Sequence, residues 1–124
     1  VLKSPEKIYR DPNDNFIVCD AGNKRLVLYD QYGGYQKQIQ NKIFSYPVSV
    51  VFFQDHYFVL DGVTSEIYVL DKNGKYLSTI SSLLPGDDTA MLKPSDIYVA
   101  EDGKLLIADT GNNRLLVCSV FIEK

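Results

Sequence analysis

Apolar residues in this chain occur in short runs that polar, turn-forming residues separate. Runs such as Phe16–Cys19, Tyr57–Leu60 and Leu105–Ala108 have the length of a β-strand and are too short for a helix. Gly-containing sequences that are typical of β-hairpin turns lie between such runs, at residues 32–34, 72–74 and 101–103. The pattern predicts no amphipathic helix of useful length, so we expect an all-β chain.

The chain also repeats itself. When residues 4–29 are placed on residues 93–118, the identities at one constant offset are Pro5 and Pro94, Ile8 and Ile97, Tyr9 and Tyr98, Asp20 and Asp109, Gly22 and Gly111, Asn23 and Asn112, Arg25 and Arg114, and Leu26 and Leu115. A second shift places Asp20 on Asp61 and Gly33 on Gly74. Three copies follow, at about residues 2–43, 44–90 and 91–124. Strand-rich repeats of about 41 to 48 residues are typical of β-propeller blades.

Each copy predicts an antiparallel, four-stranded blade. The expected strands are residues 7–10, 16–20, 25–30 and 35–40 in the first copy, 48–53, 57–61, 66–71 and 76–81 in the second, and 96–100, 105–109 and 114–119 in the third, whose fourth strand has no clear signal before Lys124. The second strand of each copy is apolar on both faces, as expected for a sheet packed between two others. A Greek-key sandwich is the competing architecture, but it gives no reason for three similar units.

Composition narrows the class of partner. The 124 residues suit one domain, and 13 Lys and Arg against 16 Asp and Glu give a net charge of −3. That balance argues against a general binder of nucleic acid or of anionic membranes. No apolar run approaches the roughly 18 residues that span a bilayer. The two cysteines, Cys19 and Cys118, cannot form a disulfide framework, and we expect both to be small buried hydrophobic residues.

A short motif follows the second strand of the first and third copies. It reads Asp-x-Gly-Asn-x-Arg, at residues 20–25 and 109–114. With the upstream Pro and the downstream Gly-x-Tyr, it resembles the NHL repeat, the blade unit of NHL β-propellers. The middle copy keeps Asp61 but has Glu66 in place of the Arg. The resemblance implies a propeller, often of six blades, that serves as a protein- or RNA-binding platform. Some relatives are enzymes, notably the peptide-amidating lyase.

We interpret the motif as structural. A strand-end Asp can accept backbone N–H bonds from the loop that follows it, as in an Asx-turn. The Gly allows positive φ and the Asn tolerates it. The Arg can pair with a carboxylate across the loop or in the next blade. These loop-organising residues are Asp20, Gly22, Asn23, Arg25, Asp61, Asp109, Gly111, Asn112 and Arg114.

The sequence offers little for catalysis, so we predict no catalytic, metal-binding or cofactor-binding residue. His56 is the only histidine, and the multi-histidine metal site of the amidating lyase cannot be built from it within this chain. Asp87 and Asp88 form an acidic pair without the further oxygen ligands of a calcium loop. The alternative is a metal-dependent enzyme of the lyase or lactonase kind, whose ligands lie in blades outside these residues.

A binding face follows from strand direction. Because strands alternate in direction within a blade, the loops between second and third strands share a face with the connections between blades. Longer loops on a rigid scaffold are where binding usually occurs. Candidate binding residues on this face are Lys24, Lys42, Tyr46, Glu66, Asp87, Asp88, Lys93 and Asn113. Their mixed charge favours a protein or peptide partner over RNA, which selects a clearly basic surface.

The last expectation concerns closure. Three blades form an open arc, and a propeller removes its exposed ends only by completing the ring. The two-sided apolar strands predict that both open ends are hydrophobic. We therefore expect a six-bladed ring, completed either by a second copy of the chain as a homodimer or by three further blades of a longer parent chain.

Overall fold

The computed structural model describes residues 1–80 and 91–119. These residues form β-strands joined by turns, with two single-turn 3₁₀ helices, and the all-β prediction is confirmed. The strands are β1 Pro5–Arg10, β2 Phe16–Asp20, β3 Arg25–Tyr29, β4 Tyr35–Gln40, β5 Pro47–Phe53, β6 His56–Asp61, β7 Glu66–Asp71, β8 Tyr76–Ile80, β9 Asp96–Val99, β10 Lys104–Asp109 and β11 Arg114–Ser119. The 3₁₀ helices are η1 Ala21–Asn23 and η2 Thr110–Asn112. None of the described helices is long and apolar enough to cross a membrane.

Each repeat forms its own antiparallel sheet, and the strands follow one another in chain order. Blade 1 is β1-β2-β3-β4, blade 2 is β5-β6-β7-β8, and blade 3 is β9-β10-β11 within the described residues. A fourth strand of blade 3 would fall after Ser119, outside those residues. The predicted strands agree with the observed ones to within two residues at each end. The hairpin turns close where glycines adopt positive φ, at Gly33, Gly74 and Gly103.

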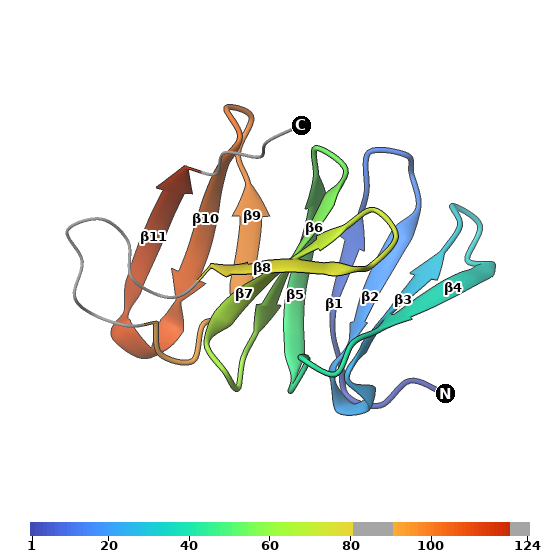
Figure 1. Cartoon of the computed structure of the whole chain (residues 1–124), viewed down its shortest axis with the longest axis horizontal. Coiled ribbons are helices and arrows are strands. Elements are labelled where there is room, and N and C mark those ends of the chain that lie inside the picture. Colours follow the sequence, from blue (N-terminus) through green and yellow to red (C-terminus); the bar gives the residue numbers. More distant parts are fainter. Residues whose placement is uncertain (81–90, 120–124) are drawn as a thin grey trace.

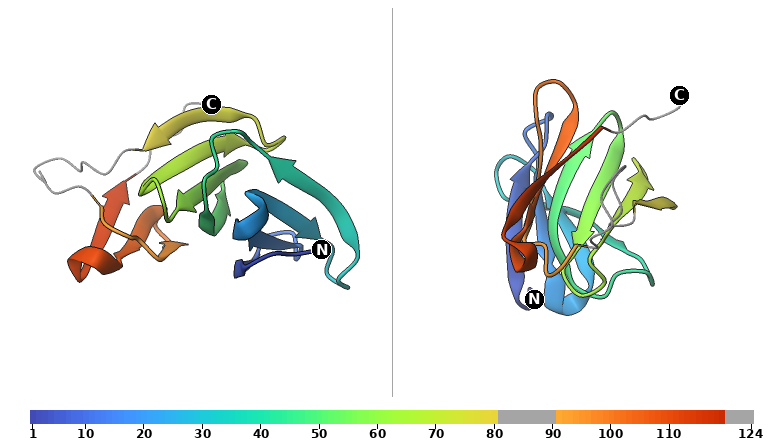
Figure 2. Two further views of the ribbon diagram at one scale, coloured as in Figure 1. Left: turned by 90° about the horizontal axis from the view of Figure 1, so that it is seen from below. Right: turned by 90° about the vertical axis from the view of Figure 1, so that its left-hand side faces the viewer.

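The first strand of each blade lies at the inner edge of the arrangement. Strand β1 contacts β5, and β5 contacts β9 (Figure 1). From these strands the blades spread outward, and the second view shows them as an open arc with β4 and β8 on its outer side (Figure 2). This is the packing of neighbouring β-propeller blades.

The core lies between blades rather than inside one sheet. Ile17 and Leu26 of blade 1 pack with Val59 of blade 2, while Phe58 packs on the other side with Ile107 of blade 3. Blade 2 is therefore buried on both faces, which explains why β6 is apolar without alternation. Cys19 is buried as predicted, whereas Cys118 is only partly buried, because it lies on β11 at the outer margin of the second core cluster.

A polar network joins the inner strands of all three blades. Lys7, Ser49 and Asp96 occupy the same position of their repeats, two residues after the repeat Pro. The Lys7 Nζ lies 2.9 Å from the Asp96 Oδ2, and the Ser49 hydroxyl donates to the Asp96 Oδ1 at 2.7 Å. Burial alone would raise the pKa of Asp96, but these bonds and the Ile97 N–H hold it below the ordinary value. The network fixes the blades relative to one another.

Candidate functional site

The loops between second and third strands lie along one face of the arc, together with the connection between blades 1 and 2 and the residues directly before β9 (Figure 1). Each loop is tied to the segment that leads into its own blade. The N–H groups of Gly22, Gly62 and Gly111 donate to the carbonyls that precede β1, β5 and β9, at 2.8, 3.0 and 2.7 Å. We call this side the loop face. The direction of the strands predicted that these two kinds of segment would share a face, and they do.

In blade 1 the motif carboxylate holds the loop together from inside. Asp20 is fully buried, and it accepts hydrogen bonds from the Lys3 N–H at 2.6 Å, the Asn23 Nδ2 at 2.8 Å and the Arg25 Nε at 2.7 Å. Burial by itself would raise the pKa of Asp20, but the donors outweigh it and lower the pKa. The Arg pairs across its own loop, which is one of the two pairings that the sequence allowed.

Blade 3 repeats this arrangement. Asp109 is fully buried and accepts from the Leu92 N–H at 2.8 Å, the Asn112 Nδ2 at 2.9 Å and the Arg114 Nε at 2.6 Å. Burial again opposes ionisation, and the same kinds of donor lower the pKa of Asp109 below its ordinary value. Two loops with the same motif thus have the same internal structure.

Two details of the predicted motif are wrong. Asp20 and Asp109 do not cap the backbone of the following 3₁₀ helix, because their oxygens are occupied by the preceding segment and by side chains. The positive φ falls at the residue after the motif Asn, Lys24 at 54° and Asn113 at 53°, and neither at Gly22 and Gly111 nor at Asn23 and Asn112.

The glycines are needed for close approach instead. A Cβ on Gly22 would lie 2.6 Å from the Lys3 carbonyl oxygen, and one on Gly111 would lie closer still to the Leu92 carbonyl oxygen. Any side chain here would push the loop away from the segment to which it is hydrogen-bonded. The motif therefore requires Gly because the loop lies so close to the preceding segment, and not because the backbone needs a positive φ at this position.

The middle loop has no 3₁₀ helix, and its buried carboxylate is held by different donors. Asp61 is buried, and its Oδ1 accepts from the N–H groups of Val63 and Thr64 at 3.0 and 3.1 Å. Its Oδ2 accepts from the N–H groups of Ser45 and Tyr46 at 2.8 and 3.0 Å. Backbone groups here do the work that Asn and Arg do in the other two loops. The predicted Asx-turn is present at this loop alone among the three.

A pocket of about 330 Å³ opens on the loop face where the three blades meet. Blade 1 contributes Glu6, blade 2 contributes Tyr46 and Val63, and the segment leading into blade 3 contributes Lys93. The remaining lining residues are Val48, Gly62, Pro94 and Ser95. The Tyr46 hydroxyl lies 3.5 Å from the Glu6 Oε2. The pocket thus combines apolar walls with a carboxylate, an ammonium group and a phenol.

Asp61 and Gly62 position the residues that line this pocket. The Asp61 carboxylate fixes Tyr46 on one side and Val63 on the other, so both walls depend on one buried group. A Cβ on Gly62 would lie 2.8 Å from the Val48 Cγ1, so the glycine leaves room for the Val48 side chain. The middle copy, which departs from the motif, is therefore the copy that shapes the pocket.

The predicted binding residues are distributed unevenly. Tyr46 and Lys93 line the pocket. The others in the described chain lie on loop-face segments outside the pocket lining, namely Lys24, Lys42, Glu66 and Asn113. Asp87 and Asp88 lie outside the described residues.

The lining residues that sequence reasoning missed are Glu6, Val48, Gly62, Val63, Pro94 and Ser95. Glu6, Val48 and Ser95 share one repeat position, directly after the repeat Pro, and the alignment of copies could have grouped them. An apolar Val63 inside a polar loop was a second available signal.

The described residues contain no group of three His, Cys, Asp or Glu side chains that could hold a metal ion. His56 begins β6 at the opposite end from the loop face, and its Nδ1 lies 2.6 Å from the Gln54 carbonyl oxygen.

Comparison with known proteins confirms the resemblance in the third repeat and the fold throughout. The NHL repeat model matches residues 91–118. A streptogramin B lyase structure superposes with a TM-score of 0.69 at 13% identity, covering 90% of this chain and 36% of that one. Selenomethionine-substituted virginiamycin B lyase from Staphylococcus aureus gives 0.65 at 13% identity, covering 96% and 42%. A protein of unknown function from Bacteroides caccae gives 0.65 at 15%, covering 94% and 46%.

The chain therefore spans less than half the length of these structures. At such identities the likeness shows the fold alone, which is that of β-propeller blades. None of the curated proteins matches the chain in sequence.

Proposed function

We propose that this β-propeller segment is a non-enzymatic scaffold that binds a protein or peptide through its loop face. The observation that carries the proposal is the pocket between Glu6, Tyr46, Val63 and Lys93, which draws its walls from three separate blades. Binding sites in proteins are concave, largely apolar and furnished with a few oriented polar groups. A site shared by rigid blades needs little reorganisation when a ligand enters, and this lowers the cost of binding.

The chemistry of the pocket favours a peptide. Val48, Val63 and Pro94 offer an apolar surface for a hydrophobic side chain, and Glu6 and Lys93 offer opposite charges to the flanking groups. Tyr is among the residues that are enriched in protein interfaces. A nucleic-acid backbone would instead require a basic groove with stacked aromatics, whereas this pocket is mixed in charge and the chain carries −3.

Selection of peptides on the immobilised chain tests the proposal. A phage-displayed library of linear twelve-residue peptides is the probe, and the selected peptides are synthesised and titrated into ¹⁵N-labelled protein. We expect amide shifts to concentrate at Tyr46, Gly62 and Val63. Val63 is 68% exposed, so Val63→Glu should leave the fold intact and weaken binding by about tenfold or more. Lys72→Ala, on the opposite face, is the matched control and should bind like the wild type. Peptides whose affinity ignores Val63→Glu would refute the assignment.

Two alternatives are separated by direct measurements. The likeness to lyase structures favours, as a second candidate, part of a metal-dependent propeller enzyme with its ligands in other blades. Tight stoichiometric zinc or calcium, measured by mass spectrometry of a protein that includes those other blades, would support it. An RNA-binding NHL domain would show steeply salt-dependent binding to a fluorescein-labelled, uridine-rich single strand, measured by fluorescence anisotropy.

A further inference from the structure

The candidate pocket holds two opposite charges, which come from the two blades that flank blade 2. Glu6 lies on β1 of blade 1, and Lys93 lies in the segment that leads into blade 3. Blade 2 contributes the apolar side chains of Val48 and Val63. Glu6 and Lys93 are exposed, and neither forms an ion pair with any residue that the structure describes. Within the described chain, both charges are therefore available to a ligand.

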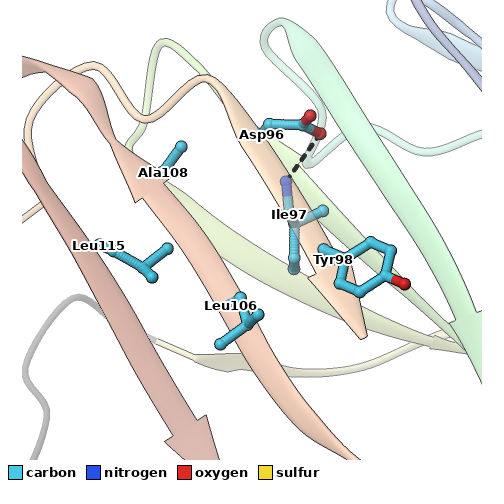
Figure 3. A pocket seen from close by; sticks show the side chains of 6 residues that line it. All are labelled: Asp96, Ile97, Tyr98, Leu106, Ala108 and Leu115. Carbon is cyan, nitrogen blue, oxygen red and sulfur yellow. Dashed lines mark hydrogen bonds between the residues drawn. The ribbon is translucent and has the colours of Figure 1, made fainter. Parts of the chain in front are cut away.

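The charged residues nearest to them along β1 and β9 pair with each other instead. The Lys7 Nζ lies 2.9 Å from the Asp96 Oδ2, so this ammonium group does not neutralise the neighbouring Glu6. The Asp96 Oδ1 also accepts the Ile97 N–H at 2.9 Å, as Figure 3 shows at the start of β9. The inner network thus uses its own charges and leaves those of the pocket unpaired.

The backbone of β1 places the carboxylate of Glu6 in the pocket. The register of β1 against β2 shifts between Pro5 and Lys7, so Glu6 is the extra residue of a bulge. Val48 has the same place in β5, where the register also shifts. Bulges redirect side chains next to functional sites, and here both redirected side chains line the pocket. The Tyr46 hydroxyl, which lies 3.5 Å from the Glu6 Oε2, orients the carboxylate.

The backbone around Lys93 is held on both sides. The Leu92 carbonyl accepts the Gly111 N–H at 2.7 Å, and the Ser95 N–H donates to the Ala108 carbonyl at 2.9 Å. Lys93 itself has a φ of 47°, in the left-handed region that is costly for a residue with a side chain. The ammonium group therefore starts from a fixed point of blade 3, and its separation from the Glu6 carboxylate is set by the packing of the blades.

We propose that Glu6 and Lys93 set the direction in which a peptide crosses the pocket, and this inference rests on the proposed function. The preferred ligand has an apolar side chain, which packs on Val48 and Val63, with a basic residue on one side and an acidic residue on the other. The basic residue lies towards Glu6 and the acidic residue towards Lys93. A peptide with its basic residue first therefore runs from blade 1 to blade 3, and one with its acidic residue first runs the opposite way.

Charge complementarity is the reason for this occupant. A ligand with charges of one sign would meet one attractive and one repulsive side chain, whereas a ligand with both signs can satisfy both. Exposed ion pairs contribute little individually, so we expect a preference of about three- to tenfold in Kd. Salt should weaken this preference, because both charges are exposed.

Charge-varied peptides test the selectivity. The probe is the tightest selected peptide whose binding is weakened by Val63→Glu, synthesised with Lys and Glu, Glu and Lys, two Lys or two Glu around its apolar residue. Fluorescence anisotropy at low salt should show that the wild type prefers the two mixed peptides. Lys93→Glu should prefer two Lys, and Glu6→Lys should prefer two Glu. Lys72→Glu and Glu101→Lys change the net charge equally on the opposite face and should retain the wild-type preference. Circular dichroism verifies that the variants fold.

A spin label on the peptide tests the direction. A nitroxide at the N-terminus of the peptide with Lys first should broaden the amide signals around Glu6, and with Glu first those around Ser95. In the double variant Glu6→Lys with Lys93→Glu, the two patterns should exchange. Pocket-binding peptides that ignore these reversals, or that cross in one direction whatever their charge order, would overturn this inference and leave the proposed function standing. Selection that gives no peptide sensitive to Val63→Glu would overturn both.

Discussion

The strongest prediction concerns the buried carboxylate of the third loop. Asp109→Ala removes the acceptor of three hydrogen bonds, from the Leu92 N–H, the Asn112 amide and the Arg114 guanidinium. The side chains of Asn112 and Arg114 are partly exposed and can turn to water, but the Leu92 N–H loses its partner at the interface between loop and preceding segment. An orphaned buried donor costs about 1–3 kcal/mol, and a hydrogen bond to a charged group contributes about 1.5–3 kcal/mol net of its exchange with water.

The expected loss is therefore about 2–4 kcal/mol in the free energy of unfolding, or roughly 30- to 700-fold in the equilibrium constant. Urea denaturation at pH 7, followed by far-UV circular dichroism, measures it. All proteins are compared at one concentration. The midpoint should fall while the slope with denaturant stays the same.

Glu66→Ala is the matched comparison, because Glu66 holds the position that Arg114 holds in the third loop. The middle loop is organised by backbone donors to Asp61, so removal of Glu66 should cost about 0.5 kcal/mol or less, as for other partly exposed substitutions. Equal losses at Asp109 and Glu66 would refute the conclusion that the motif carboxylate organises its loop.

Three further predictions follow from the same loops. Gly111→Ala should lower stability by about 1–3 kcal/mol in the same urea assay, because its Cβ presses on the Leu92 carbonyl. Lys24→Gly should raise the thermal midpoint, since a left-handed Lys is strained, and should do so more than Asn113→Gly, since Asn tolerates that conformation. The pKa of Asp109 is lowered in the folded chain from its ordinary 3.8, so the unfolded chain takes up the proton first as pH falls. Stability should therefore be constant above about pH 5 and decline below it, and the decline should be shallower in Asp109→Asn, measured by urea midpoints from pH 7 to pH 3.

The sequence predicted the architecture because the repeat is visible as spacing. Strand ends coincide with Gly, Asp and Asn at fixed offsets, and short apolar runs between them leave few alternatives to a blade. Strand β6, which contains Phe58, is buried on both faces. The lack of alternation between apolar and polar residues in its sequence indicated this. Local pattern was sufficient here because each strand pairs with the next one in the chain.

The candidate site was only partly predictable, because its lining residues come from segments that are far apart in the sequence and meet only in the folded chain. Tyr46 and Lys93 were found from their place in blade connections, but Glu6 comes to them from another blade. The motif Gly was assigned a backbone role that Lys24 and Asn113 perform instead. Nothing in the residue types distinguishes a glycine required for φ from one required for close packing, since both uses follow from the missing Cβ.

The departure of the middle loop from the motif has a physical consequence for the pocket. In blades 1 and 3 the buried carboxylate takes side-chain donors from Asn and Arg, and those side chains are then committed to the loop. The Asp61 carboxylate accepts hydrogen bonds from four backbone N–H groups. The side chains of its loop are therefore not needed as donors to it. Val63 is consequently available as an exposed apolar wall, and the same carboxylate fixes Tyr46 opposite to it. The middle repeat thus keeps its buried anchor while its exposed side chains change, which is the arrangement that the proposed binding surface requires.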